Sequence, residues 1–193
     1  ILRSKSMDRN SYDSGDWFNR IDWTLQDNGF ASGLPRKDDN GEKWPIIAPR
    51  LLNEKIKPTP AEIARTFAAT RDLLAIRQSS TLFRLRSADE IKRRLRFFNV
   101  GPQQVPTVIA AELDGRDLAG ANFARIIYLV NVDKVVQRID EARLISRKLR
   151  LHPMQAHPNA GDPRVRDYAR FDPTFGRFEI PARSIAVFVE LNR

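Results

Sequence analysis

The pattern of apolar residues predicts one long helix over residues 60–78. Thr59 suits the N-cap, Pro60 suits the first helical position, and Glu62 completes a capping box with Thr59. Apolar residues then recur at helical spacing, and we expect the helix to end near Ser79. The predicted apolar face comprises Ile63, Ala64, Phe67, Thr70, Leu73, Leu74 and Ile76.

After a short second helix, the apolar pattern changes to the two-residue period of β-strands. Ser87 and Glu90 form another capping box, which predicts a helix that ends near Leu95. The segments that follow are rich in Val, Ile and Phe and are separated by clusters of Gly, Pro and Asp. The predicted strands are residues 97–100, 107–113, 125–132, 149–152, 176–180 and 184–191.

These strands predict an antiparallel β-sandwich in the second half of the chain. Several short strands with turn signals between them are typical of that fold. Residues 125–132 and 184–191 are the most continuously apolar, so we expect them to be central. We place the domain boundary near residue 85, which gives one domain of residues 1–85 and a sandwich domain of residues 86–193.

Residues 1–50 show little periodicity and contain many Gly, Pro, Asp and Asn residues. A loop of that length is usually functional or disordered. Its large apolar side chains argue against disorder, because such surface is expected to become buried. They are Trp17, Phe18, Ile21, Trp23, Phe30 and Trp44. We therefore expect an ordered, functional loop system that takes its full shape only when packed against the rest of a longer protein.

Aromatic, acidic, amide and guanidinium side chains gather between residues 11 and 23, which makes this segment the candidate ligand site. Gly15 and the surrounding Ser, Asn and Asp residues predict an irregular loop. Such side chains suit a sugar, because rings stack on its apolar face while polar groups bond its hydroxyls. A polar surface loop anchored by buried Trp17 and Trp23 is the alternative. The candidate substrate-binding residues are Tyr12, Asp13, Asp16, Trp17, Asn19 and Arg20.

The same segment resembles a known family. Residues 2–6 and 11–20 resemble the segment after the eighth barrel strand in type I pullulanases and limit dextrinases, which debranch α-glucans within the α-amylase family. Residues 15–20 also match a Gly-Asp-x-x-Asn-Arg-like element found in many α-amylase-family enzymes. The resemblance implies that Asp16 and Arg20 face glucose units on the non-reducing side of the cleaved bond.

Two later segments extend the resemblance. Residues 75–83, at the end of the predicted helix, are similar to the end of the last barrel helix in pullulanase-like enzymes. Residues 178–189 resemble the last hairpin of the β-sandwich that follows the barrel, with Pro181 in its turn because proline lacks an N–H for strand pairing. The implied fold is an α+β fragment: a remnant of the last β/α unit of a (β/α)8 barrel, long loop plus helix, then a C-terminal antiparallel β-sandwich.

The resemblance also implies a function. The chain is expected to be the C-terminal portion of a debranching enzyme that hydrolyses α-1,6-glucosidic linkages in pullulan, starch or glycogen branches. Its expected partners are an α-glucan, such as pullulan or a branched dextrin, and the N-terminal barrel of the parent chain. The sequence begins with Ile1 rather than Met, which favours a fragment of a longer polypeptide.

We expect no catalytic residue in this chain. Retaining glycoside hydrolysis needs two carboxyl groups roughly 5 Å apart. In the α-amylase family these groups follow earlier barrel strands, which would precede Ile1. Asp13, Asp16 and Asp22 share one loop, and carboxylates so placed are more often ligand contacts or turn formers than a catalytic pair. The isolated chain is therefore predicted to be inactive.

Composition narrows the other classes of function. The chain has no cysteine, and His152 and His157 lie five residues apart in a proline-rich stretch, so we expect no metal site and no cofactor. The +9 formal charge is mostly dispersed, and its densest parts, residues 92–94 and 147–150, lie beside predicted structural elements. We therefore expect a solvated surface and no nucleic-acid partner.

Two rival interpretations stay open, a stand-alone carbohydrate-binding module and a basic nucleic-acid-binding domain. The first would bind glucan without a barrel, and the second would show affinity that falls steeply with salt. No apolar run reaches the roughly 20 residues of a membrane span, so no membrane association is expected. The sequence does not fix the cellular compartment.

Overall fold

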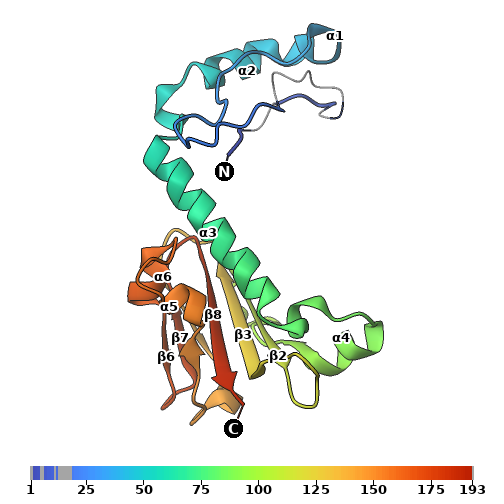
Figure 1. The fold of residues 1–193 in the computed structure, drawn as a ribbon, viewed down its shortest axis with the longest axis vertical. Helices are drawn as coiled ribbons and strands as arrows, with labels where there is room; N and C mark the ends of the chain where they lie inside the picture. Colours follow the sequence, from blue (N-terminus) through green and yellow to red (C-terminus); the bar gives the residue numbers. More distant parts are fainter. Residues whose placement is uncertain (1, 5–6, 11, 13–18, 193) are drawn as a thin grey trace. The chain divides into compact units, whose positions relative to one another are not determined.

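The structure is a computed structural model that describes residues 2–4, 7–10, 12 and 19–192. The chain forms two compact units, Ile1–Ala68 and Ala69–Arg193 (Figure 1). The boundary falls inside the long helix α3 (Pro60–Gln78). Among the described residues, no helix combines the length and the apolar character needed to cross a bilayer.

The first unit contains more helix than the predicted loop system. It includes α1 (Lys37–Asn40), the 3-10 helix η2 (Gly41–Lys43), α2 (Trp44–Leu51) and the 3-10 helix η3 (Glu54–Ile56). The expectation of a loop through residue 50 is therefore wrong for residues 37–50. The helical pattern is hard to see in the sequence because the elements are short and α2 carries a proline in its interior, Pro49.

Helix α3 has the predicted bounds, Pro60–Gln78, and the predicted start. The Glu62 carboxylate accepts hydrogen bonds from the Thr59 backbone N–H (2.8 Å) and hydroxyl (3.0 Å), and the Glu62 N–H donates to Thr59 Oγ1 (3.3 Å). Both halves of the capping box are thus formed. Helix α4 (Ala88–Arg94) also begins as predicted, with Ser87 Oγ accepting from the Glu90 N–H.

The second unit contains two antiparallel sheets. In order across the larger sheet, the strands are β1 (Leu95–Phe97), β2 (Val108–Asp114), β3 (Phe123–Asn131), β8 (Ser184–Leu191) and β5 (Arg150–Leu151). In order across the smaller sheet, they are β4 (Gln137–Asp140), β7 (Arg177–Ile180) and β6 (Arg170–Asp172). The remaining elements are the 3-10 helices η4 (Thr81–Arg84) and η5 (Ala142–Leu144) and the helices α5 (Pro153–Ala156) and α6 (Pro163–Tyr168).

The predicted strands are found, with three differences. Strand β1 lies earlier than the expected residues 97–100, and β4 and β6 were not predicted. Both missed strands are short and alternate charged with apolar residues, so each carries only one buried or half-buried apolar side chain, Ile139 and Phe171. The two most apolar segments, β3 and β8, pair with each other at the centre of the larger sheet, as expected.

The predicted closing hairpin is wrong, because its two strands lie in different sheets. Strand β7 pairs with β4 and β6, whereas β8 pairs with β3 and β5. The corner between them is held by side chains: Ser184 Oγ donates to the Pro181 carbonyl (2.8 Å), and Asn131 Nδ2 lies 3.1 Å from the Ile180 carbonyl and 3.0 Å from that of Pro181. Asn131 is 1% exposed, so its amide links the two sheets inside the protein.

Both faces of the larger sheet are buried. Ile127 and Leu129 on β3 face the smaller sheet, where they belong to one core with Phe178 and Ile180 of β7. The alternate residue Ile126 belongs to a second core, which includes Ile76 from the end of α3. Figure 1 shows this end of α3 lying across β3 and β8. The second unit is therefore layered as helix, five-stranded sheet and three-stranded sheet.

The contribution of α3 to the second unit can be tested by truncation. A chain of residues 58–193 keeps all of α3, whereas 86–193 loses the buried side chains of Ile76 and Leu82. Fully burying one such side chain stabilises a protein by about 1.5–3 kcal/mol. Chemical denaturation should show that 86–193 is less stable than 58–193 by about 3 kcal/mol or more. Equal stabilities would contradict the proposed role of α3.

Candidate functional site

The structure describes three of the six residues proposed to bind substrate. Tyr12, Asn19 and Arg20 are all exposed, and the Tyr12 side chain is fully open to solvent. Asp13, Asp16 and Trp17 lie outside the described residues. The exposed side chains are therefore accessible to a ligand, while the geometry of the complete set stays a prediction.

Asp22 organises the loop that follows. Its Oδ1 accepts hydrogen bonds from the Thr24 N–H (2.9 Å) and hydroxyl (2.6 Å), and its Oδ2 accepts from the backbone N–H groups of Gln26 (3.1 Å) and Asp27 (3.0 Å). The hydrogen bonds from Thr24, which favour the charged form, lower the pKa of the Asp22 carboxyl. The loop carboxylates were expected to be ligand contacts or turn formers, and Asp22 is a turn former.

Buried amides and carboxylates hold the N-terminal segment in place. Asn40, at the end of α1, donates from Nδ2 to Asp8 Oδ1 (3.0 Å) and to the Arg36 carbonyl (3.0 Å), and its Oδ1 accepts from the Arg9 N–H (3.1 Å). Asn40 is only 3% exposed. Sequence reasoning missed it because Asp8 lies 32 residues away and no local pattern relates the two.

The tryptophans of the first unit differ in exposure. The Trp23 side chain is 70% exposed, so it does not act as the buried anchor that the alternative interpretation of the loop required. Trp44 is half-buried and its indole Nε1 donates to the Pro35 carbonyl (2.9 Å). Trp44 therefore anchors α2, whereas the ring of Trp23 is exposed.

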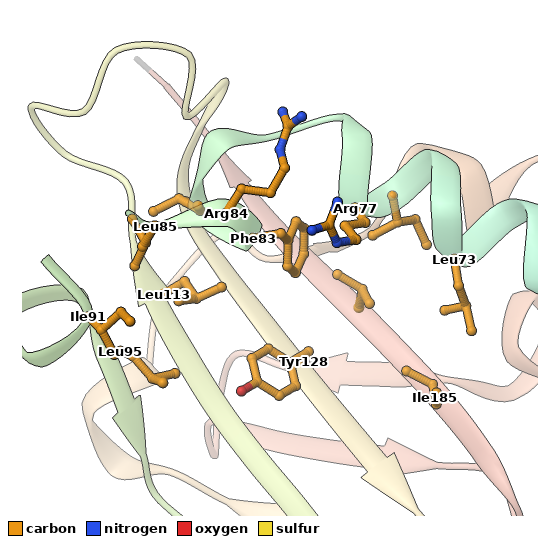
Figure 2. Close-up of a pocket in the computed structure, with 13 residues that line it drawn as sticks. Leu73, Arg77, Phe83, Arg84, Leu85, Ile91, Leu95, Leu113, Tyr128 and Ile185 are labelled. Atoms are coloured by element: carbon orange, nitrogen blue, oxygen red, sulfur yellow. The ribbon is translucent and has the colours of Figure 1, made fainter. Parts of the chain in front are cut away.

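An apolar groove of about 760 Å³ lies on the outer face of the five-stranded sheet. Leu73 and Phe83 point toward the sheet from α3 and η4, whereas Arg84 points away from it (Figure 2). Tyr128 of β3 lies in the floor, where burial raises the pKa of its phenol. The groove offers apolar contacts and no pair of acidic side chains, so its chemistry suits packing rather than catalysis.

His152 is a buried structural histidine. Its Nδ1 accepts a hydrogen bond from the Met154 N–H (3.2 Å), which leaves the proton on Nε2, 3.1 Å from Ser79 Oγ. Ser79 Oγ in turn donates to the Ile76 carbonyl (2.7 Å). Burial lowers the pKa of His152 to about 4, because the charged form would lose its hydration. In the neutral imidazole both ring nitrogens therefore make a hydrogen bond, and the one at Nδ1 caps the start of α5.

The described residues contain no group of three His, Asp or Glu side chains close enough together to hold a metal ion. The polar features of this part of the chain are turn formers, helix caps and ion pairs. Its accessible candidate chemistry is the exposed aromatic and polar side chains of the first unit, together with the apolar groove of the second.

Comparison with known proteins gives the family. Residues 25–191 match the family described as alpha-1,6-glucosidases, pullulanase-type, C-terminal. The chain belongs to this family. It is 41% identical over 197 residues to the chloroplastic pullulanase 1 of Arabidopsis thaliana, an alignment that covers 98% of this chain and 20% of the relative. A Klebsiella aerogenes pullulanase is 41% identical over 120 residues, covering 62% of this chain and 11% of the relative.

Solved structures agree with this membership. PulA from Klebsiella pneumoniae in complex with maltotriose matches all of this chain and 20% of its own, with a TM-score of 0.83 and 32% identity. PulA from Klebsiella oxytoca gives a TM-score of 0.82 and 29% identity, again over the whole of this chain and 18% of the other. This pullulanase-type C-terminal region thus spans about a fifth of the relatives it matches.

The buried imidazole predicts that this pullulanase-type region loses stability in mild acid. The unfolded chain holds a proton on His152 with a pKa near 6.5, whereas the folded chain does so only near 4. The unfolded state therefore binds more protons between these values, and the free energy of unfolding should fall by about 2 kcal/mol from pH 7 to pH 5.

Denaturation at several pH values checks this slope. His152→Gln should flatten it whatever its effect on stability at pH 7. His157→Gln is the matched control, because His157 is exposed, and it should keep the wild-type slope. An unchanged slope in His152→Gln would show that other groups cause the acid sensitivity.

Proposed function

We propose that this chain is the C-terminal portion of a pullulanase-type debranching enzyme that hydrolyses α-1,6-glucosidic linkages in pullulan, starch or glycogen branches. The observation that carries the proposal is the match of the whole chain to pullulanase structures, including one in complex with maltotriose. The chain corresponds to about a fifth of those enzymes, and its partner in the proposal is the barrel formed by the rest of the parent chain. An α-glucan is the proposed substrate of the complete enzyme.

The first unit supports a dependence on the parent enzyme, because it has almost no core of its own. Among its described residues the buried hydrophobic side chains are Ile47 and Ile63. Besides Tyr12 and Trp23, four large aliphatic side chains are instead exposed, and their surface would become buried if the unit packed on a barrel. They are Ile21, Ile46, Leu52 and Ile56.

We assign residues 1–85 to the end of the catalytic barrel, with α3 as its last helix, and residues 86–193 to the C-terminal sandwich domain. The compact units divide the chain earlier, within α3, because Leu73 and Ile76 already pack on the larger sheet. In this proposal α3 has two roles: its first part belongs to the barrel, and its end covers the sandwich. The apolar groove beside it adds surface suited to that junction.

The proposed substrate contacts are those of the N-terminal loop, Tyr12, Asp13, Asp16, Trp17, Asn19 and Arg20. The exposure of Tyr12, Asn19 and Arg20 supports this assignment, because a side chain that binds substrate must be accessible. The hydrogen-bonded turn around Asp22 follows the loop directly. The exposed Trp23 ring is a further candidate for stacking.

The isolated 193-residue chain should not hydrolyse pullulan or branched dextrin, because the acid and nucleophile of the reaction would come from the missing barrel. A reducing-sugar assay with homogeneous protein measures this, with the complete parent enzyme as the positive control. Turnover by the isolated chain above a blank would mean that a catalytic pair lies within these residues, and the proposal would fail.

In the complete enzyme, Asp16→Ala or Arg20→Ala should lower kcat/KM for pullulan by roughly tenfold to 150-fold, since a hydrogen bond to a charged group contributes about 1.5–3 kcal/mol. The melting temperature should stay near the wild-type value, because a side chain directed at a ligand leaves no buried partner unpaired.

Arg9→Ala is a matched control for these variants, because Arg9 is an exposed cation of the same unit whose ion pair with Asp39 is long (3.7 Å). Its kinetics should be unchanged. If Asp16→Ala and Arg20→Ala melt several degrees lower but keep normal kinetics, both residues are structural and the substrate-contact assignment is wrong.

A further inference from the structure

One end of the sandwich carries a row of charged side chains that crosses four strands. On the larger sheet, Arg96 of β1 pairs with Glu112 of β2 (3.2 Å), and Glu112 also pairs with Arg125 of β3. Arg125 then pairs with Glu190 of β8 (3.2 Å). Arg147, from the loop before β5, lies 3.7 Å from Glu190. The row lines a cavity of about 340 Å³.

Arginines dominate this cavity. Six of its nine lining residues are arginines, and two are acidic, Glu112 and Asp114. Three further carboxylates, Glu90, Glu141 and Glu190, bond to the same arginines, so cations still exceed anions by one. The six arginines are Arg93, Arg96, Arg116, Arg125, Arg143 and Arg147. The fold thus joins the two basic segments, residues 92–94 and 147–150, that the sequence leaves far apart.

Apart from Arg125, which is 11% exposed, exposure separates the two signs of charge. The side chains of Glu112 and Glu141 are 8% and 12% exposed, whereas those of Arg96, Arg143 and Arg147 are 40%, 51% and 46% exposed. The carboxylates therefore lie beneath the guanidinium groups and hold them in place. The surface that a solute would meet is cationic, and its arginines are oriented in advance.

Several arginine donors are incompletely used. The Nε of Arg96 is buried, and the described residues supply it with no hydrogen-bond partner. Arg143 reaches Glu112 only at 3.4 Å, and the contact of Arg147 with Glu190 is 3.7 Å. Buried polar atoms are normally paired, so the unpaired nitrogen shows that the hydrogen-bonding capacity of Arg96, a residue of the cavity lining, is not fully used.

We propose that this cavity binds a phosphate-type oxyanion, held by the guanidinium groups of Arg96, Arg143 and Arg147, with Arg93 at its rim. A tetrahedral oxyanion presents several acceptor oxygens, which match the fork of N–H donors on each arginine. The anion would balance the excess positive charge of the row. The shared chemistry is that of a phosphate group, either free or carried as an ester on a sugar.

Titration calorimetry on the 193-residue chain tests the proposal, with inorganic phosphate as the probe and sodium chloride added to keep ionic strength constant. Saturable binding of one phosphate per chain is expected. Arg147→Gln and Arg93→Gln should each weaken it by about tenfold, because each removes a charged donor. Both residues make only exposed or long ion pairs, so folding should be spared, and circular dichroism checks this.

Arg138→Gln is the matched control, since Arg138 is an exposed arginine paired with Glu179 on the smaller sheet (2.6 Å), away from the cavity lining. It should bind phosphate as the wild type does. A parallel titration with glucose 6-phosphate distinguishes the two sources of the group. Tighter binding than inorganic phosphate identifies a sugar ester as the ligand, and equal or weaker binding identifies free phosphate.

Three results would overturn the proposal. Binding that does not saturate at constant ionic strength would show that the charges form an ion-pair network alone. Equal weakening in Arg138→Gln would show non-specific attraction to a basic protein. Unchanged affinity in both Arg147→Gln and Arg93→Gln would place any phosphate elsewhere.

Discussion

The burial of β3 and β8 on both faces is the constraint on which the second unit depends. These strands pair along their whole length, and their side chains alternate between the two cores. A strand apolar on both faces needs a layer on each side. The smaller sheet supplies one layer, and the end of α3 with η4 supplies the other. The hydrogen bonds from Asn131 to the Ile180 and Pro181 carbonyls then tie the two sheets together at the corner.

The first unit is held together differently. Polar contacts fix parts of it: Asn40 binds Asp8, and Asp22 closes its own turn. Such bonds fix a shape but contribute little net stability, typically about 1 kcal/mol each. With Ile47 and Ile63 as the buried apolar side chains of its described part, the unit lacks the hydrophobic burial that stabilises a domain. Its exposed apolar residues are consistent with a surface that the remainder of a larger enzyme covers.

Sequence reasoning succeeded where the signal is local and strong. The capping box at Thr59 and Glu62 located the start of α3, and continuous apolar runs identified β3 and β8 as central. It failed where contacts between distant segments decide the structure. The last two strands look like a hairpin because a proline turn joins them, but the preference of each for a different sheet outweighs the short connection. No sequence pattern indicates the partners of Asn40 or the fact that Arg93 and Arg147 line one cavity. The substrate role proposed for the N-terminal loop rests on family resemblance.

Native-state hydrogen exchange tests most directly whether the second unit is self-sufficient and the first is not. In the isolated chain, amides of β3 and β8 should exchange only through global unfolding, while residues 19–57 should exchange with opening free energies near zero. In the complete parent enzyme, residues 19–57 should become strongly protected. If these residues are as protected as β3 in the isolated chain, the first unit is stable by itself and its proposed dependence on the barrel is wrong.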